Sequence, residues 1–380
     1  MREFMRVALA LAFLAGYTGL ANAQVQIQED NTNIGTTSAD FLQLGAGARG
    51  MALGGSYSAL VQDVEALYYN PAGLPMMNKG LDVMLSVMPY FADTDYFWLG
   101  FAFPFSAGQY ALGVSFGSFG FSDQPIYTAT DQENESGRTY SVNQTVVGLS
   151  FAHAFIDRFT GGVTVKYIQD RLADATAQGF ALDVGTNFHT ELVGRPVAFA
   201  VVIQNLGGQL EHTGSGLDLT ALPQSDDPDA PVANVDPAPA RFRAQSFPIP
   251  TTFRVGLSYD VIASAPNRVS LLGEFFELNN ADPSWGFAGE YEWNPPDGPI
   301  SAALRGSYSF QPDNFLSDAE NLEIGSRSQE GLPNKVLDGM ALGGGLKYRF
   351  ANYEARFDYT YRHFGYLGSR NVFTLGFALQ

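Results

Sequence analysis

The chain has 380 residues, no cysteine and a formal net charge of −18, with 39 Asp and Glu against 21 Lys and Arg. This acidic excess argues against nucleic acid as a partner, and the lack of cysteine excludes a disulfide scaffold and a thiolate metal site. Hydrophobic residues make up 46% of the chain, aromatic residues 13% and charged residues only 16%, a composition that favours aromatic-rich strands.

The N-terminus has the three parts of a secretory signal peptide. Arg2 and Arg6 precede an almost wholly apolar stretch at 7–20, which ends in the small-residue sequence Ala21-Asn22-Ala23. This is the order found in cleavable export signals, so we expect residues 1–23 to be removed. No later run approaches the ~18 apolar residues of a transmembrane helix, and a mature chain in a membrane would therefore cross it as strands.

Residues 24–80 form a segment with many turn-forming residues. It contains Gly47-Ala48-Arg49, then Gly54-Gly55, then Asp63, and then Asn70-Pro71-Ala72-Gly73. Glycine pairs permit turns with positive φ, and Asn-Pro starts a turn, so a compact, turn-rich segment is predicted. The glycines do not form a phosphate-binding loop, because neither a Lys-Ser/Thr pair nor a ribose-binding acid accompanies them.

From Leu81 onward the sequence contains about fourteen apolar-alternating runs, each long enough to cross a bilayer as a tilted strand. Turn sequences such as Asn294-Pro295-Pro296-Asp297-Gly298 separate them. The predicted strands are 81–90, 95–105, 109–119, 141–155, 160–171, 177–189, 196–206, 251–262, 267–278, 284–293, 299–310, 338–350, 353–364 and 370–379.

The alternation is clear in the run from 284 to 293. Trp285, Phe287 and Tyr291 share one face, whereas Glu290 and Glu292 share the other, because side chains change face at every residue. The aromatic face would meet lipid in a barrel or the core in a soluble sandwich. Periodicity alone does not separate these two folds.

The connection lengths favour the barrel. The three longest connections, at 120–140, 207–250 and 311–337, are the third, seventh and eleventh, whereas the even-numbered connections are short. Long outer loops with short periplasmic turns are the pattern of outer-membrane barrels. The connection at 207–250 is too polar and too often broken by proline to pack into a core, so we interpret it as a mobile solvated loop in preference to a calcium site.

Charged side chains fall on the strand face opposite the aromatic one. Their mixture of signs favours a salt-bridged lumen over an ion-selective filter, which concentrates one sign. Fourteen strands also enclose a lumen too wide for side chains alone to fill, so the segment ahead of the barrel is expected to occupy it as a plug. The predicted lumen-facing charged residues are Lys166, Arg254, Glu274, Glu290, Arg305, Lys347, Arg349, Glu354, Arg356, Asp358 and Arg362.

Nothing in the sequence has the pattern of a catalytic site. The four histidines, His153, His189, His212 and His363, lie in different strands or loops, and none is patterned with a serine and an acid. We therefore expect a protein that is not an enzyme and that holds no cofactor and no metal.

The segment from Phe41 to Leu74 resembles the start of the PorV/PorQ family of outer-membrane proteins, which is distantly similar to the FadL-type transporters of long-chain fatty acids. The resemblance is carried by Gly-Ala-Arg at 47–49, Met-Ala-x-Gly-Gly at 51–55, Asp63 and Tyr-Tyr-Asn-Pro-Ala-Gly-Leu at 68–74. It implies an all-β, antiparallel transmembrane barrel of about fourteen strands, at 81–380, with a plug at 24–80 that carries the Asn-Pro-Ala motif and follows the signal peptide at 1–23 predicted above.

The resemblance implies two functions. In the PorV branch the barrel takes part in type IX protein secretion at the outer membrane, with secretion-system components or exported cargo as partners, and this is our main expectation. In the FadL branch it passes hydrophobic small molecules such as fatty acids, which predicts a lateral gap or an apolar pocket beside the plug. A purely structural barrel in the outer-membrane lipid is a third alternative.

Overall fold

The computed structural model describes residues 35–78, 80–221, 237–310 and 339–379. The chain divides into Met1–Thr32 and Asn33–Gln380, and every described residue lies in the second unit. The predicted signal peptide at 1–23 therefore falls outside the described residues. In the described part of the chain, no helix is both long and apolar enough to cross a membrane.

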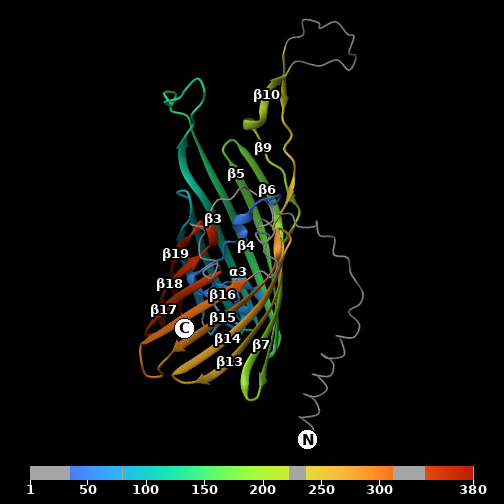
Figure 1. The fold of residues 1–380 in the computed structure, drawn as a ribbon. Coiled ribbons are helices and arrows are strands. Elements are labelled where there is room, and N and C mark those ends of the chain that lie inside the picture. Colours follow the sequence, from blue (N-terminus) through green and yellow to red (C-terminus); the bar gives the residue numbers. More distant parts are fainter. Residues whose placement is uncertain (1–34, 79, 222–236, 311–338, 380) are drawn as a thin grey trace, which may run out of the picture. The chain divides into compact units, whose positions relative to one another are not determined.

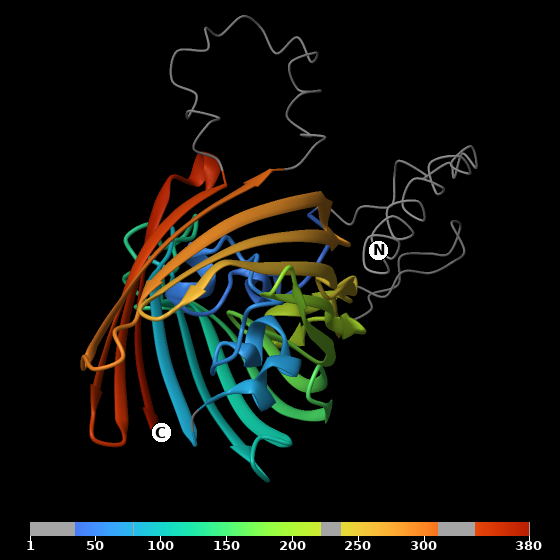
Figure 2. The ribbon, with the colours of Figure 1, turned by 90° about the horizontal axis from the view of Figure 1, so that it is seen from below.

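Fourteen long strands form one closed antiparallel barrel (Figures 1 and 2). The main sheet has fifteen strands, but β9 (Thr213–Gly214) is a two-residue strand on β6, which leaves fourteen. These pair in chain order, and β1 pairs with β19 to close the ring. Their bounds are β1 Leu81–Pro89, β2 Asp95–Phe105, β3 Tyr110–Pro125, β4 Thr139–Ile156, β5 Phe159–Leu172, β6 Ala175–Leu192, β7 Arg195–Gly207, β13 Thr252–Ser264, β14 Asn267–Leu278, β15 Ala281–Trp293, β16 Ile300–Phe310, β17 Met340–Phe350, β18 Tyr353–His363 and β19 Ser369–Leu379.

The predicted all-β barrel of about fourteen strands is confirmed, and β2 and β14 begin and end at the predicted residues. The β3–β4 hairpin is longer than predicted, since β3 continues to Pro125 and β4 starts at Thr139. Its extension is held by the backbone ladder and by the rings of Phe121 and Tyr140, 5.7 Å apart. The predicted strands stop too early because the hairpin becomes polar beyond those residues. A strand ladder is formed by backbone hydrogen bonds and does not require an apolar face.

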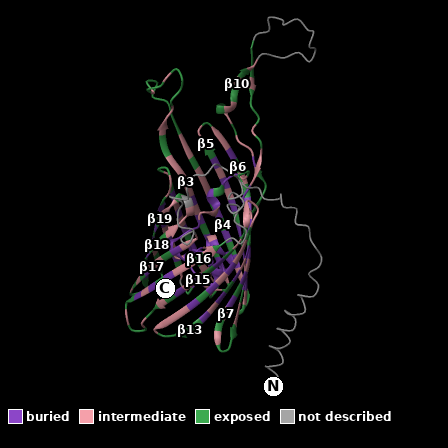
Figure 3. Ribbon diagram, viewed as in Figure 1, coloured by how far each residue is buried: buried purple, intermediate pink, exposed green. Residues whose placement is uncertain are grey.

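The apolar face of the strands points outward. Trp285 and Phe287 on β15 are 42% and 53% exposed, whereas Glu290 on the same strand is 2% exposed. Buried and exposed positions alternate along the strands in the same way around the barrel (Figure 3). An apolar outer belt with polar side chains inside is the arrangement that a barrel in lipid requires, and it is the reverse of a soluble sandwich.

The two ends of the barrel differ in their connections. The third connection (126–138) and the described parts of the seventh (208–221 and 237–251) lie at one end, which we call the long-loop end. In Figure 1, β10 and the tip of the β3–β4 hairpin mark it. The even-numbered connections, such as 157–158 and 193–194, lie at the opposite, short-turn end. The predicted separation of long and short connections therefore holds for these segments, and the eleventh connection falls outside the described residues.

The expectation that 207–250 does not pack into a core is wrong at the two ends of that connection. There β8 (Gln209–Leu210) pairs with β12 (Phe247–Pro248), and Leu210 and Ile249 are buried in the core. A second pair, β10 (Asp218–Ala221) with β11 (Ala238–Arg241), continues away from the barrel. The prediction missed these apolar residues because it rested on the high Pro and Asp content of the whole connection. The most acidic part, 222–236, lies outside the described residues.

Residues 38–77, called the inner segment below, lie within the ring of strands (Figure 2). They form four short helices: η2 (Asp40–Gln43), α2 (Ala48–Ala52), α3 (Ala66–Tyr69) and η3 (Pro71–Met76). Helix α2 packs against β16 to β19, and η3 packs against β4, β5 and β6. Large buried side chains of this segment, including Tyr57 and Tyr69, form much of the hydrophobic core.

Glycines in the wall let the Asn70-Pro71 turn approach the strands closely. A Cβ on Gly185 of β6 would stand 2.1 Å from Asn70 Oδ1, and a Cβ on Gly162 of β5 would stand 2.5 Å from the Pro71 carbonyl carbon. Neither distance is compatible with a side chain. These two strand glycines, which weaken a sheet elsewhere, are therefore explained by the close contact between the wall and the inner segment.

Candidate functional site

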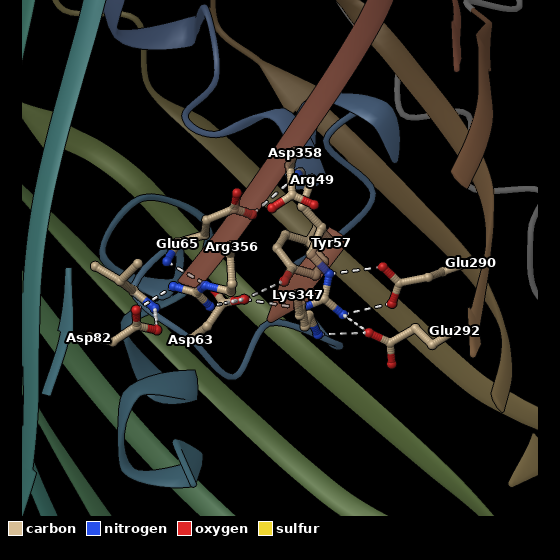
Figure 4. Close-up of polar contacts among 12 residues, drawn as sticks. Arg49, Tyr57, Asp63, Glu65, Asp82, Glu290, Glu292, Lys347, Arg356 and Asp358 are labelled. Atoms are coloured by element: carbon tan, nitrogen blue, oxygen red, sulfur yellow. Dashed lines mark hydrogen bonds and ion pairs between the residues drawn. The ribbon is translucent and has the colours of Figure 1, made fainter. Parts of the chain in front are cut away.

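Arg49 of α2 is the centre of a buried ionic network between the inner segment and the wall (Figure 4). Its Nε donates to Glu290 Oε2 at 2.9 Å, and its Nη2 donates to Glu290 Oε1 at 2.6 Å. Its Nη1 lies 3.0 Å from Asp63 Oδ2, and its Cζ lies 5.1 Å from the centre of the Tyr57 ring. The bidentate pair fixes both the position and the orientation of α2 against β15.

Asp63 is shared between two arginines. Besides Arg49, the Nη1 of Arg356 on β18 lies 3.8 Å from Asp63 Oδ2, and the Tyr57 hydroxyl donates to the same oxygen at 3.3 Å. The Nη2 of Arg356 donates to Asp82 on β1, whose Oδ2 accepts from the backbone N–H of Val64 at 3.2 Å. The inner segment is thus tied to β1 and β18 as well as to β15.

Arg305 on β16 connects the remaining acids of the wall. Its Nε lies 2.6 Å from Glu290 Oε2, and its Nη1 lies 2.6 Å from Asp358 Oδ1 on β18. All three side chains are buried. Removing charges from water costs several kcal/mol per ion unless each is paired and hydrogen-bonded, and here both acids contact at least one guanidinium.

Glu65 is buried within the inner segment itself. Its Oε2 accepts from the backbone N–H of Gly50 at 3.1 Å. Gly47 has a φ of 76°, and a Cβ there would stand 1.9 Å from Glu65 Oε1, so only glycine leaves room for the carboxylate. Burial, together with the charges of Asp63 and Asp358, raises the pKa of Glu65 well above its usual value.

The Asn-Pro-Ala-Gly motif at 70–73 contacts the opposite side of the wall. Asn70 Oδ1 accepts from Ala72 N at 3.0 Å and so caps η3, while Asn70 Nδ2 donates to the carbonyls of Ser58 at 2.9 Å and Thr186 at 3.2 Å. The hydroxyl of Thr160 donates to the carbonyl of Ala72 at 2.7 Å. Asparagine fits this position because it both donates and accepts.

The other charged residues that the sequence placed in the lumen lie on inward positions, in further pairs or singly. Arg362 on β18 forms no hydrogen bond or ion pair with a described residue, and its Cζ lies 5.1 Å from the Phe364 ring centre. The pairs are Lys166 with Asp183 at 2.7 Å, Arg254 with Glu274 at 2.6 Å, Lys347 with Glu292 at 3.1 Å and Arg349 with Glu354 at 3.7 Å. Of these, the Lys347–Glu292 pair joins the Arg49 network, because Glu292 Oε1 also lies 3.8 Å from Arg49 Nη2 (Figure 4).

Sequence reasoning missed several partners in these contacts, notably Asp82, Asp183 and Glu65. Asp82 and Asp183 are each flanked by apolar residues, in Leu81-Asp82-Val83 and Leu182-Asp183-Val184, and both are completely buried. A single acid at the inward position of an otherwise apolar strand was the available signal for these two. Glu65 lies outside the strands, and no local pattern indicated its burial.

A cavity of about 190 Å³ lies above the inner segment, towards the long-loop end. Its lower side is formed by inner-segment residues such as Gly54, Gly55 and Tyr69, and its wall by strand ends that carry Arg254 and Arg362. Gly54 and Gly55, the glycine pair of the inner segment, are thus part of the surface that a molecule entering from the long-loop end would meet first.

A second hollow, of about 450 Å³, lies on the outer face of β15 to β18. Small residues at its centre, Ala302 and Gly344, are surrounded by larger apolar ones such as Trp293, Leu304 and Phe357. The ladder between β16 and β17 is unbroken from Ile300–Tyr348 to Tyr308–Met340. The hollow is therefore a thinning of the wall by small side chains and not a gap between strands.

No protein-family model and no curated protein matches the chain. Among solved structures, it is similar to the CymD monoaromatic hydrocarbon channel, with 14% identity over 88% of this chain and 97% of that one and a TM-score of 0.54. It is similar to the toluene transporter TodX of Pseudomonas putida, with 12% identity over 88% and 98% and a TM-score of 0.53. The chain therefore shares the barrel fold of these two channels. Identities this low establish the fold alone.

Proposed function

We propose that this protein is an outer-membrane barrel that passes small hydrophobic molecules, with residues 1–23 as the export signal and residues 24–80 as a plug in the barrel at 81–380. This is the FadL-branch alternative of the sequence analysis. The secretion function of the PorV branch, with exported cargo or secretion components as partners, stays a prediction from the sequence resemblance alone.

The apolar hollow on β15 to β18 carries this proposal. The FadL-branch function predicts a lateral gap or an apolar pocket beside the plug, and the hollow lies on the strands whose inner face holds α2. At Gly343 of β17, a Cβ would stand 2.6 Å from the Cβ of Ala52. Only the backbone of the wall therefore separates the inner segment from the lipid side at this point, which is where an apolar molecule would cross between lumen and membrane.

The fold likeness supports the same proposal. The similar structures with TM-scores of 0.54 and 0.53 are described as a monoaromatic hydrocarbon channel and a toluene transporter. Both are conduits for apolar molecules, and both are covered almost end to end by the alignment. Transport through a barrel wall also needs no catalytic group, in agreement with the expectation that the protein is not an enzyme.

The test fills the hollow. Gly344→Leu adds an apolar side chain on the outward face, where a Cβ makes only ordinary contacts at 3.5 Å and beyond. We expect toluene uptake by cells that carry the Gly344→Leu barrel to fall towards that of cells lacking the protein. Gly273→Leu is the matched control, because Gly273 also faces outward with room for a Cβ but lies outside the hollow, and its uptake should equal that of the wild type.

Equal uptake by wild-type, Gly344→Leu and deletion cells would refute the hydrophobic-transport proposal. The extracellular proteome of the same deletion strain distinguishes the alternative. A loss of exported proteins from the medium, with toluene uptake unchanged, would establish the secretion function in its place.

A further inference from the structure

The cavity at the long-loop end has an unusual charge for this chain. Its lining contains two arginines, Arg254 and Arg362, and no carboxylate among the described residues, although the chain has 39 acidic residues. Arg254 is neutralised by Glu274 at 2.6 Å and also donates to Gln204 Oε1 at 3.0 Å. The positive charge of the cavity therefore comes from Arg362, which has no ion-pair partner in the part of the chain that the structure describes.

The neighbouring strand increases this positive charge. In the register of β18 and β19, Arg362 stands directly opposite Arg370. Arg370 stacks over the ring of Phe91 with its Cζ 3.5 Å from the centroid, donates to its neighbour's carbonyl, and has a buried Nε without a hydrogen-bond partner among the described residues. Like charges directly opposite each other on a sheet are destabilising, so an anion at this place would be bound favourably.

The rest of the lining suits a ring that carries a carboxylate. Phe276 and Leu42 supply apolar surface, while the hydroxyl of Tyr69 accepts from Ala46 N at 3.3 Å and keeps its own proton available among the described residues. The side chain of Ser309 also forms no hydrogen bond with a described residue. A volume of about 190 Å³ would hold about six molecules of liquid water, which admits a single-ring molecule and excludes a long acyl chain.

We propose that this cavity binds a small organic carboxylate, such as a single-ring aromatic acid, and that Arg362 recognises its charge. The guanidinium of Arg362 offers the bidentate geometry that matches a carboxylate, and the Tyr69 and Ser309 hydroxyls offer further donors. The inference rests on the proposed function for the transport steps after binding, because it assigns the cavity as the first site that a transported molecule meets. It adds that the molecules entering the barrel include single-ring acids, whose carboxylate is held in this cavity.

The test measures binding to the full-length protein in detergent by isothermal titration calorimetry, with sodium benzoate and with benzyl alcohol, a neutral single-ring molecule of similar size. The wild type should bind benzoate at least tenfold more tightly than benzyl alcohol. Arg362→Gln should weaken benzoate binding roughly ten- to hundredfold, the range for a hydrogen-bonded charge pair, and leave benzyl alcohol binding unchanged. Arg158→Gln, which removes the same charge from an exposed position at the short-turn end, should bind benzoate like the wild type.

Equal binding of benzoate and benzyl alcohol, or undiminished benzoate binding by Arg362→Gln, would overturn the proposal. Inorganic phosphate added as a competitor supplies a further criterion, since displacement of benzoate at equal concentration would show a general anion site and not a carboxylate site. Circular dichroism confirms that each variant is folded. Toluene uptake in the Gly344→Leu experiment does not depend on these results, so the two proposals can fail separately.

Discussion

Replacing Arg49 by methionine is expected to loosen the inner segment while the barrel stays folded. The barrel is held by the continuous ladder from β1 to β19, to which Arg49 does not contribute. The inner segment depends on the bidentate contact of Arg49 with Glu290 and on its contact with Asp63. Methionine has a similar length and no charge, so it preserves packing volume and removes the ion pairs.

The magnitude is set by the burial of the partners. Removing one member of a buried ion pair costs about 3–5 kcal/mol, because the other charge stays buried. Glu290 keeps Arg305 at 2.6 Å, and Asp63 keeps Arg356 at 3.8 Å, so we expect a loss near the lower limit. Since about 1.4 kcal/mol is a factor of ten, a loss of about 3 kcal/mol corresponds to a roughly hundredfold larger population of the released inner segment.

A single cysteine reports this release. The chain has no cysteine of its own, Ser56 is 1% exposed, and its hydroxyl has no hydrogen-bond partner among the described residues, so Ser56→Cys is nearly isosteric. Labelling of this thiol by a water-soluble reagent should be about a hundred times faster in the Arg49→Met background, in proportion to the released population. Arg241→Met, which breaks the exposed pair with Asp218, is the control and should label at the rate of the parent.

An unchanged labelling rate in Arg49→Met would refute the reasoning, because it would mean that packing alone retains the inner segment. A loss of the folded barrel in the same variant would refute it in another way. In that case the ionic network would be required for assembly of the barrel wall, and the barrel would not fold independently of the inner segment.

Two further predictions concern the same segment. Asn70→Ala removes the cap of η3 and two buried donors to backbone carbonyls, so it should destabilise the inner segment by about 1–3 kcal/mol and raise Ser56→Cys labelling about five- to hundredfold; an unchanged rate would show that Pro71 and the wall glycines suffice. Because burial raises the pKa of Glu65, its stabilising contribution is complete below the unfolded pKa of about 4.3 and is lost as the pH rises through the folded pKa. Glu65→Gln stays neutral at every pH and should not show this loss of stability. The ratio of its Ser56→Cys labelling rate to that of the parent should therefore fall between pH 5 and pH 8, and a constant ratio would contradict the pKa shift of Glu65.

The wall of this protein could be predicted from its sequence because strand alternation is a local property. Trp285, Phe287 and Glu290 report their opposite faces within a few positions of one another, and the lengths of the connections then favour a barrel over a soluble sandwich. The ionic network could be predicted only in part. Arg49 and Glu290 are 241 positions apart, and their contact depends on where the inner segment stops within the lumen, which no periodicity in either element specifies.

The seventh connection illustrates a different limit. Its high Pro and Asp content is an average over the whole connection. Single apolar residues near its two ends, such as Leu210 and Ile249, are nevertheless buried in the core. Composition averages over a segment, but burial is decided residue by residue. A prediction for such a connection therefore has to weigh each large apolar side chain near a strand end against the polar average.

Three successive glycines in β17 explain why the inner segment and the outer hollow occupy the same strands. Gly343 lies against Ala52 on the inside, and Gly345 faces the guanidinium of Arg305, whose Nη1 would stand 2.9 Å from its Cβ. Gly344, between them, points outward into the hollow. Glycine in a strand costs roughly 0.5–1 kcal/mol relative to alanine, so the run is destabilising by itself. Its positions are those where the backbone is approached from both sides, by the inner segment within the barrel and by the hollow outside it. Under the proposed function, β17 is therefore the strand at which an apolar molecule would cross the wall.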